Sequence, residues 1–254
     1  MNPDQNEAPL FAAGDKKLKS GVFIVLEGID GCGKTTQKNL LADFLTQKGY
    51  PVETTREPGG TLLGELIREL VLSPKYQEML PLTETLLYLT DRAQHVGQKL
   101  LPALRVGRIV ISERYIDSTI AYQGFGRGLD QAMLDRLNNL VTQGLKPNLT
   151  FLLDIPPEIA RMRLISRKSN LPLDRLEQEK LVFYRRNYRR VAFLKRLDRL
   201  EQEKLAFYRR VREGYLALVQ RQPDSYVVLD ACQPPVIIHQ KIQRLVEERI
   251  LVSI

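Results

Sequence analysis

The chain has 254 residues, of which 43% are hydrophobic and 27% charged, and it carries a formal net charge of +8. This length and balance allow one self-contained core, so we expect a single α/β domain at residues 21–254 after a flexible leader at residues 1–20. Apolar runs fall short of the ~20 residues of a membrane span, and the leader lacks the basic-then-apolar order of a signal peptide. Since Cys32 and Cys232 cannot make a disulfide framework, we expect reduced thiols, a cytoplasmic location and no membrane partner.

The positive charge is confined to one segment. Residues 161–210 hold 16 Lys and Arg against 6 Asp and Glu, a net +10 that leaves −2 for the rest of the chain. A basic protein raises the question of nucleic acid binding. Because the basicity belongs to one segment and not to the whole domain, we expect no nucleic acid partner.

The chain is organised around residues 28–35, whose sequence is Gly-Ile-Asp-Gly-Cys-Gly-Lys-Thr. They follow a predicted strand at 22–26 and precede a helical pattern at 34–48, which is the setting of the motif G-x-x-x-x-G-K-[ST]. In this motif backbone amides surround phosphate oxygens, Lys34 reaches the β and γ phosphates of ATP, and the Thr35 hydroxyl joins a Mg²⁺ shell. Cys32 is either a small filler facing the loop or a reactive thiol near the helix start. The predicted phosphate-binding residues are Gly28, Ile29, Asp30, Gly31, Cys32, Gly33, Lys34, Thr35 and Thr36.

A second strand is predicted at residues 51–55, ending at Arg56 and the turn Glu57-Pro58-Gly59-Gly60. The carboxyl ends of parallel strands meet at one edge of a sheet, so Arg56 is expected to face the same crevice as the glycine-rich loop. A cis peptide bond at Pro58 is one way to aim Arg56. An ordinary turn with a surface arginine is the alternative.

Helices are predicted at residues 62–72 and 83–104. Tyr88 and Arg92 share a helix face because they are four residues apart. They could offer a ring to stack on a base and a guanidinium to read its edge, or be a core tyrosine beside a surface arginine. His95 is expected to be a surface or hydrogen-bonded histidine and not a catalyst.

A third strand at residues 108–112 ends in Glu113 and Arg114. A carboxylate at this point of a P-loop protein is the usual second anchor for Mg²⁺, with Thr35 as the first. Arg114 would place positive charge between two phosphates. The next segment, residues 116–127, holds Thr119 and Tyr122 among small side chains and could admit a flat ring.

Two further strands are predicted at residues 149–155 and 226–230, with a terminal helix at 235–251. Five strands separated by helices imply a parallel sheet with right-handed crossovers. The predicted fold class is therefore α/β, a P-loop NTPase fold with a five-stranded parallel sheet flanked by helices and a helical lid.

Several ordered blocks together resemble the thymidylate kinase family, which are P-loop nucleoside monophosphate kinases. The blocks are residues 27–37, 56–61, 91–95, and 113–115 leading into 118–123, and the resemblance covers residues 22–250. It implies ATP-dependent phosphorylation of dTMP to dTDP, a step of dTTP biosynthesis. It also implies ATP and dTMP as substrates, Mg²⁺ as cofactor, and a homodimer formed through helices.

The resemblance assigns roles at the phosphate end of the site. Asp30 is expected to bind the sugar 3′-hydroxyl of dTMP, while Arg56 and Arg114 hold its phosphate. The family often has Asp where this chain has Glu113. Some members carry a basic residue at the position of Gly31 and others supply it from the lid, and this chain resembles the second group. The predicted catalytic residues are Lys34, Arg56, Arg114 and Glu113.

At the base end, the resemblance implies that Tyr88 stacks on thymine and that Arg92 bonds its O4. Thr119 and Tyr122 would line the base and sugar pocket, with Tyr122 disfavouring a ribose 2′-hydroxyl.

The predicted lid, residues 161–210, contains a tandem duplication. Residues 173–186 recur 24 residues later as 197–210, with only Val182 replaced by Ala206. The first copy lies at about the expected distance after the fourth strand, whereas the second runs directly into the following helix, so either copy could form the lid. The extra copy is expected to project, because 24 added residues would turn the downstream face of a straight helix by about 120°. Candidates to close over the ATP phosphates, each with a solvated helix face as the alternative, are Arg163, Arg167, Arg175 and Arg199.

Two other functions stay open on the sequence. One is a kinase for a different nucleoside monophosphate, and the other is a nucleic-acid-binding P-loop NTPase, for which DNA binding would depend on salt. A GTPase lacks support because the chain has no Asn-Lys-x-Asp guanine motif.

Overall fold

The computed structural model describes residues 16, 18, 20–169, 198–201 and 203–252. Most of the leader, the first copy at 173–186 and its Arg175 lie outside the described residues, as does the expected projection of that copy. Among the residues that are described, no helix is long and apolar enough to cross a membrane.

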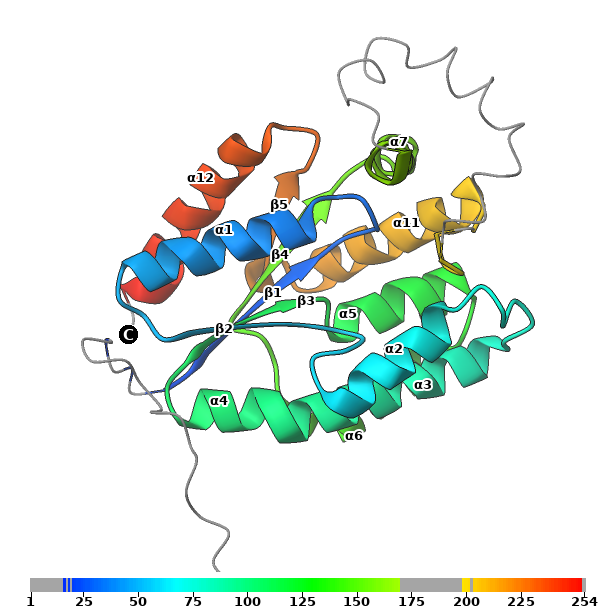
Figure 1. Ribbon diagram of the computed structural model, residues 1–254, viewed down its shortest axis with the longest axis horizontal. Coiled ribbons are helices and arrows are strands. Elements are labelled where there is room, and N and C mark those ends of the chain that lie inside the picture. The colour runs from blue at the N-terminus through cyan, green and yellow to red at the C-terminus, as the bar shows by residue number, and fades with distance from the viewer. Residues whose placement is uncertain (1–15, 17, 19, 170–197, 202, 253–254) are drawn as a thin grey trace, which may run out of the picture.

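The five predicted strands form one parallel sheet in the order β2-β3-β1-β4-β5, which confirms the expected architecture (Figure 1). The first strand in the chain lies at the centre, so the loop that follows it opens at the middle of the sheet edge. The bounds are β1 Val22–Glu27, β2 Val52–Arg56, β3 Ile109–Glu113, β4 Leu149–Asp154 and β5 Tyr226–Asp230.

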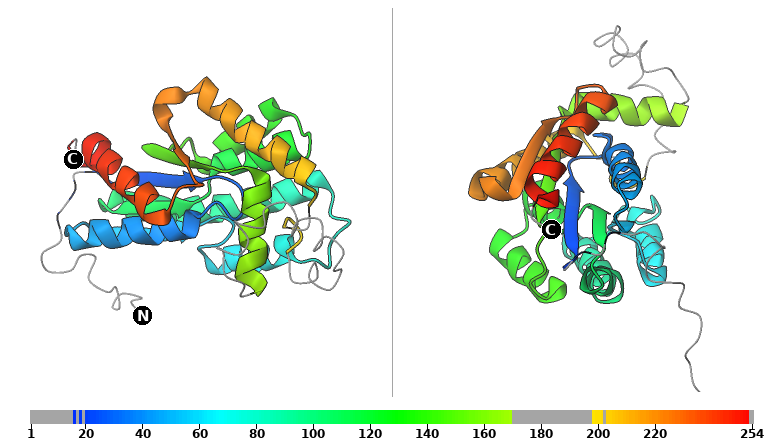
Figure 2. Two further views of the ribbon diagram at one scale, coloured as in Figure 1. Left: turned by 90° about the horizontal axis from the view of Figure 1, so that it is seen from above. Right: turned by 90° about the vertical axis from the view of Figure 1, so that its left-hand side faces the viewer.

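The central strands are apolar because helices cover both of their faces (Figure 2). Alternate residues of β1 enter different clusters, as the two-residue period of a strand requires. Ile24 packs with Leu41 and Leu45 of α1 (Lys34–Gln47), whereas Phe23 and Val25 pack in a second cluster with η1 (Val96–Leu100). This double-sided burial fixes β1 and therefore the start of the glycine-rich loop.

The predicted helices are present, with some changes in their internal form. Helix α2 spans Leu62–Leu72 as expected, whereas the segment predicted at 83–104 is α3 (Pro81–His95), the π-helical η1 and α4 (Leu101–Arg105). Residues 116–127 form α5 (Ile116–Thr119) and the π-helical η2 (Ile120–Gly126). The remaining helices are α7 (Pro157–Ser169), α11 (Leu205–Arg221), η3 (Pro223–Ser225), α12 (Pro235–Val246) and η4 (Glu247–Leu251).

Helix α6 (Gln131–Thr142) was not predicted. Its signal was available in the sequence: the Asp130 carboxylate caps the helix by accepting a 2.7 Å hydrogen bond from the Met133 amide. Leu134, Asn138 and Thr142 are its buried residues, and the half-buried Met133 and Leu137 complete an apolar period that the sequence analysis did not use.

Candidate active site

The glycine-rich loop between β1 and α1 surrounds the Lys34 ammonium. Lys34 Nζ donates hydrogen bonds to the carbonyl oxygens of Gly28 at 2.9 Å and Ile29 at 3.0 Å. Gly28 has a φ of 134°, and a Cβ there would lie 2.6 Å from the Leu153 carbonyl oxygen, so only glycine fits. The loop therefore brings a cation to the start of α1, where the first amides of a helix have no intrahelical partner.

Cys32 is buried beneath this loop. Lys34 Nζ lies 3.6 Å from its sulfur, and the residue belongs to the main core cluster. The side chain acts as the small filler that was one of the two interpretations of the sequence.

The two residues predicted to anchor Mg²⁺ meet at the end of β3. Thr35 Oγ1 donates a 2.7 Å hydrogen bond to Glu113 Oε1, and Lys38 Nζ lies 3.1 Å from Glu113 Oε2. Burial alone would raise the pKa of Glu113, but the charges of Lys34 and Lys38 and the Thr35 hydrogen bond lower it. Lys38 was missed by the sequence analysis, although it stands one helical turn after Lys34 and so shares its face.

These oxygens fit a magnesium ion that is shared with phosphates. A carboxylate and a hydroxyl are hard ligands, and Mg²⁺ typically uses one or two protein groups together with phosphate oxygens and water. Within residues 20–169, 198–201 and 203–252, no cluster of three or more His, Cys, Asp or Glu side chains could enclose a metal by itself. The donor set at Thr35 and Glu113 is therefore of the substrate-sharing kind.

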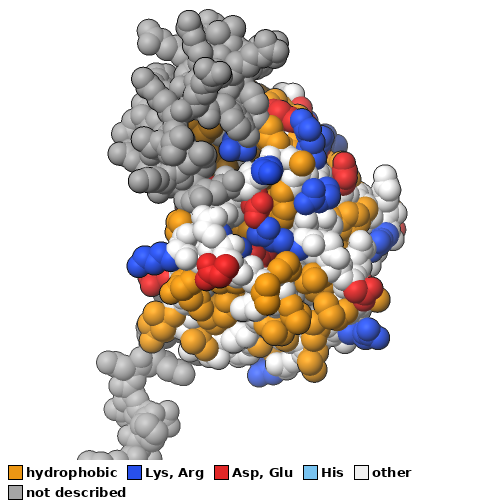
Figure 3. Space-filling model, turned by 90° about the vertical axis from the view of Figure 1, so that its right-hand side faces the viewer, with side chains coloured by type: hydrophobic (Ala, Val, Ile, Leu, Met, Phe, Trp, Pro, Cys, Tyr) orange, Lys and Arg blue, Asp and Glu red, His pale blue; other side chains and the backbone are white. Residues whose placement is uncertain are grey.

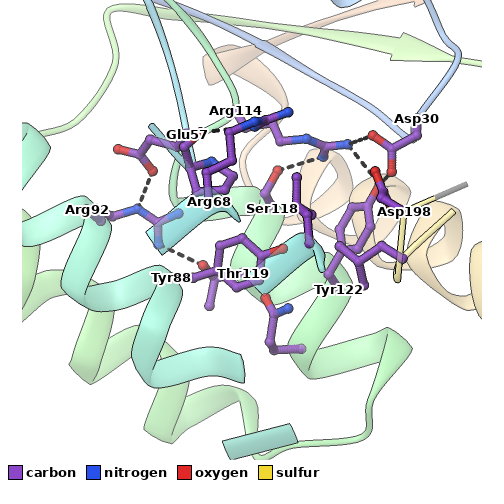
Figure 4. A pocket seen from close by; sticks show the side chains of 14 residues that line it. Asp30, Glu57, Arg68, Tyr88, Arg92, Arg114, Ser118, Thr119, Tyr122 and Asp198 are labelled. Carbon is purple, nitrogen blue, oxygen red and sulfur yellow. Dashed lines mark hydrogen bonds and ion pairs between the residues drawn. The ribbon is translucent and has the colours of Figure 1, made fainter. Parts of the chain in front are cut away.

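Arg114 connects the loop to a neighbouring pocket. Its φ of 69° is left-handed, which turns the chain sharply at the end of β3. One guanidinium nitrogen donates to Asp30 Oδ1 at 2.5 Å and to the Tyr122 hydroxyl at 2.9 Å (Figure 4). The other donates to the Ser118 hydroxyl at 3.0 Å and to the Tyr215 hydroxyl at 3.1 Å. Burial alone would raise the pKa of Asp30, but the charges of Arg114 and Lys34 and the hydrogen bonds to the carboxylate lower it to about 2.

Glu27, at the end of β1, supports this arrangement, and the sequence analysis assigned it no role of its own. It accepts hydrogen bonds from the Tyr115 amide at 2.7 Å, the Ser118 hydroxyl at 2.7 Å and the Tyr215 hydroxyl at 2.9 Å. Burial raises the pKa of Glu27 despite these bonds and the charge of Arg114. The carboxylate thus positions Ser118 and Tyr215, both of which contact Arg114.

Arg92 is buried, so the interpretation of it as a surface arginine is wrong. Its side chain is 2% exposed and donates to Glu57 Oε2 at 2.7 Å, Thr119 Oγ1 at 2.7 Å, Asn138 Oδ1 at 2.6 Å and the Tyr115 carbonyl at 2.9 Å. A guanidinium has five N–H groups. Among the described residues four of them have partners, which leaves one N–H on Nη2, and the side chain also lines a pocket.

His95 is a hydrogen-bonded histidine, as expected. Its ring nitrogens lie 2.8 Å from Glu57 Oε1 and 2.7 Å from Thr55 Oγ1. Glu57 therefore joins His95 to Arg92, and the following peptide bond to Pro58 is cis.

A pocket opens between these two arginines (Figure 4). Arg114 and Asp30 lie at one end of it and Arg92 at the other, so each end holds a guanidinium that is paired with a carboxylate, Asp30 or Glu57. The structure brings together six of the predicted dTMP residues in this pocket, whereas Arg56 does not line it. Tyr88, Thr119 and Tyr122 line the pocket as predicted. Arg68, Asp198 and Leu200 also line it, and the sequence analysis did not name them.

Arg56 stands at the carboxyl end of β2 in register with Glu113. Its guanidinium is 45% exposed and donates to Glu65 Oε2 at 2.8 Å. Strand β3 separates it from β1 and the loop that follows β1, and its guanidinium is engaged by a carboxylate of α2.

The described lid arginines lie in three different surroundings. Arg163 donates to the Ala231 carbonyl at 2.8 Å, and Arg167 is 67% exposed at 3.9 Å from Glu201. Arg199 is buried against Glu84 at 2.5 Å, so its guanidinium is already paired and does not face the loop.

The central strand β1 is followed by a phosphate loop that carries a lysine, and the neighbouring strand β3 ends in a carboxylate and an arginine beside it. This arrangement is typical of a P-loop phosphotransferase. The family model described as thymidylate kinase matches residues 26–192. The chain is 44% identical to the thymidylate kinase of Pelotomaculum thermopropionicum over 228 residues, 90% of this chain and 94% of that protein. It is 44% identical to the thymidylate kinase of Carboxydothermus hydrogenoformans over 227 residues, 89% of this chain and 97% of that protein.

Among solved structures, the thymidylate kinase of Ehrlichia chaffeensis matches with a TM-score of 0.65 and 32% identity, covering 89% of this chain and 98% of that one. The chain belongs to the thymidylate kinase family.

Proposed function

We propose a division of roles for the transfer of a phosphoryl group from ATP to dTMP, the reaction of the family to which the chain belongs. The observation that carries it is the position of Arg114, which contacts Asp30 of the phosphate loop and Ser118 and Tyr122 of the pocket. In this proposal Arg114 lies where the phosphate loop meets the pocket and serves both phosphates.

The chemistry asks for charge and alignment more than for a base. The attacking atom is an oxygen of the dTMP phosphate, which is already anionic, so repulsion between two anions is the main obstacle. Lys34 and Arg114 would offset this repulsion and hold the two phosphates in line. Arg56 would join them on the dTMP phosphate by exchanging its contact with Glu65 for a phosphate oxygen.

Magnesium would be held by Thr35 and Glu113. When bound there, it neutralises charge on the ATP phosphates. The protein's part is to keep a hydroxyl and a carboxylate adjacent, and Lys38 fixes the second carboxylate oxygen for this purpose.

The base end of the pocket suits a flat ring with a carbonyl. Tyr88 would stack on thymine, and the N–H of Arg92 that has no partner among the described residues would donate to its O4. Thr119 accepts from Arg92 and so fixes that guanidinium, while Tyr122 donates to Asp30 at 3.1 Å beside the expected sugar position.

A second copy of the chain is the partner that the family resemblance implied. Leucines at helical spacing are exposed on α2 and α3, with Leu62 85% and Leu66 59% exposed, followed by Leu82 and Leu86. Hydrophobic side chains gather on the side of the molecule where these helices lie (Figure 3). An apolar surface of this kind is typical of a protein interface, and sedimentation velocity of the purified chain tests the pairing.

A coupled assay for ADP release tests the function. We expect turnover with ATP, Mg²⁺ and dTMP, loss of turnover when the metal is chelated, and much weaker turnover with dUMP, dCMP or AMP. A preference for AMP would contradict the assignment of the base pocket. Binding to DNA without any dTMP phosphorylation would contradict the proposed function itself.

A further inference from the structure

We propose that the second copy of the duplicated segment, residues 197–210, builds the wall of the acceptor pocket, and that the first copy, residues 173–186, cannot replace it. In this proposal Arg199 is a positioning residue for dTMP binding. The proposal rests on the proposed function, because it concerns the same pocket.

Arg199 anchors the second copy to the helices that flank the pocket. Its side chain is 5% exposed, and its Nη2 donates to Oε2 of Glu84, a fully buried carboxylate of α3. Its Nε donates to the Val71 carbonyl and its backbone amide to the Leu72 carbonyl, both at 3.0 Å at the end of α2. Backbone and side chain are therefore both fixed, as a buried charge requires.

The same copy makes a second attachment through Arg127. Arg127 Nη2 donates to Glu84 Oε2 at 3.0 Å, and Arg127 Nη1 donates to Glu203 Oε1 at 2.5 Å. Gln123 Nε2 donates to the other oxygen of Glu84 at 2.7 Å. Because Glu84 and Arg127 each contact the second copy, its orientation against α3 and η2 is determined at two points.

This attachment places two side chains in the pocket wall. Asp198 and Leu200, on either side of Arg199, line the same pocket as Tyr88 and Arg92, and Figure 4 shows Asp198 near Tyr122 and Asp30. The Tyr208 hydroxyl donates to the Leu200 carbonyl at 2.9 Å, which ties the wall to the start of α11.

The residues after each copy decide which one fits. Shifting the chain by 24 residues would put Asn187 at the place of Val211, Arg190 at Gly214 and Val191 at Tyr215. Val211 is fully buried, so an asparagine there would need partners in an apolar setting.

The other two exchanges are worse. A Cβ at Gly214 would lie 2.8 Å from the Phe125 ring, so an arginine side chain has no space. The Tyr215 hydroxyl bonds Glu27 and Ser118 and accepts from Arg114, and valine would leave these groups short of a partner. The first copy thus has the matching anchor but lacks the matching continuation.

The span of the family model alone would point the other way. The family model matches residues 26–192, a span that includes the first copy and ends before the second. Since the two copies differ at one position, an alignment can use either of them. The contacts of residues 198–215 discriminate where the alignment does not.

Matched substitutions in the full-length chain test the proposal. Leu200→Ala is expected to raise KM for dTMP about tenfold or more, because it removes apolar contact from the pocket wall, while KM for ATP changes less than about twofold. Leu176→Ala, the same change in the first copy, is expected to leave both constants within about twofold of the parent chain. An increase of KM for dTMP with Leu176→Ala, equal effects of both changes, or no effect of either would overturn the proposal.

A second measurement follows the anchor without using activity. Thermal unfolding of Glu84→Gln, Arg199→Gln and the double variant is expected to show strong non-additivity, because the two side chains interact directly. The cycle of Glu84→Gln with Arg175→Gln is expected to be additive. Coupling of Glu84 to Arg175 in place of Arg199 would overturn the proposal, whereas a parent chain without dTMP kinase activity would overturn the proposed function and leave this unfolding test intact.

Discussion

Replacing Arg114 with alanine tests the centre of the proposed mechanism. The guanidinium contacts the phosphate loop through Asp30 and the pocket through Ser118, Tyr122 and Tyr215. Alanine removes the positive charge that makes these contacts. The backbone turn at the end of β3 must then form without the stabilising side chain. The change should therefore affect catalysis strongly and stability to a smaller degree.

The two magnitudes follow from different parts of the structure. An arginine on the transferred phosphoryl group is typically worth about 10³-fold or more in kcat, which corresponds to about 4 kcal/mol of transition-state stabilisation. The pKa of Asp30 falls from 3.8 to about 2, with Arg114 the largest stabilising charge. At ~1.4 kcal/mol per pKa unit, this shift corresponds to about 2.5 kcal/mol of folding free energy at pH 7, to which Arg114, Lys34 and the Tyr122 hydrogen bond contribute against desolvation. This stabilisation is fully present above about pH 4 and is lost as the pH falls through about 2.

The assay measures kcat and KM for dTMP at pH 7 together with urea denaturation of the same samples. We expect kcat to fall about 10³-fold or more, with a decrease of about 2 kcal/mol in the free energy of unfolding. Arg105→Ala, at the exposed end of α4, is the matched control and should change neither quantity. Turnover near that of the parent chain in a folded Arg114→Ala protein would refute the role of Arg114.

Three further changes test the surrounding groups. Burial and the charge of Glu57 raise the pKa of Asp91 to about 7. The folded chain therefore holds a proton that the unfolded chain loses near pH 4, and the free energy of unfolding declines as the pH rises from about 4 to about 7. Asp91→Asn should reduce this pH-dependent loss of stability by a few kcal/mol, at ~1.4 kcal/mol per pKa unit. The measurement is the free energy of unfolding by urea at about pH 5 and about pH 8, and a difference between the two pH values equal to that of the parent chain would contradict the prediction. Arg92→Lys keeps the charge but not the fork of hydrogen bonds, so the free energy of unfolding should fall by about 2–4 kcal/mol; an unaltered denaturation midpoint would show that the fork is dispensable. Glu113→Gln removes a carboxylate charge and should raise the Mg²⁺ concentration needed for half-maximal activity about tenfold, whereas an unshifted metal titration would place the metal elsewhere.

The features that the sequence predicted well are those set by neighbouring residues. The sheet follows from apolar runs of the right length, and the phosphate loop follows from glycines at fixed spacing between one such run and a helix. The meeting of Thr35 with Glu113 needed one further rule, that parallel strands end at the same edge. Each of these steps uses information within a few residues or a general property of α/β sheets.

The buried carboxylates could not be predicted in the same way. Glu84 and Glu27 stand in segments whose pattern shows only that the positions are polar. Their partners Arg199 and Tyr215 lie 115 and 188 residues away in the chain, and nothing local indicates the pairing. Arg92 was ambiguous for the same reason, since its four acceptors come from the turn after β2, the connection between β3 and α5, α5 itself and α6, and become neighbours only after folding.

The duplicated segment shows how far identical sequence can be separated by context. Arg175 and Arg199 share the two residues before them and the six after them, so the immediate sequence does not distinguish them. In the proposal, what distinguishes them is the chain that follows: Val211, Gly214 and Tyr215 fit against η2 and Arg114, and the side chains of Asn187, Arg190 and Val191 would not fit at those positions. A repeated motif therefore acquires its function from the helix that continues it, and copying the motif alone does not copy the site.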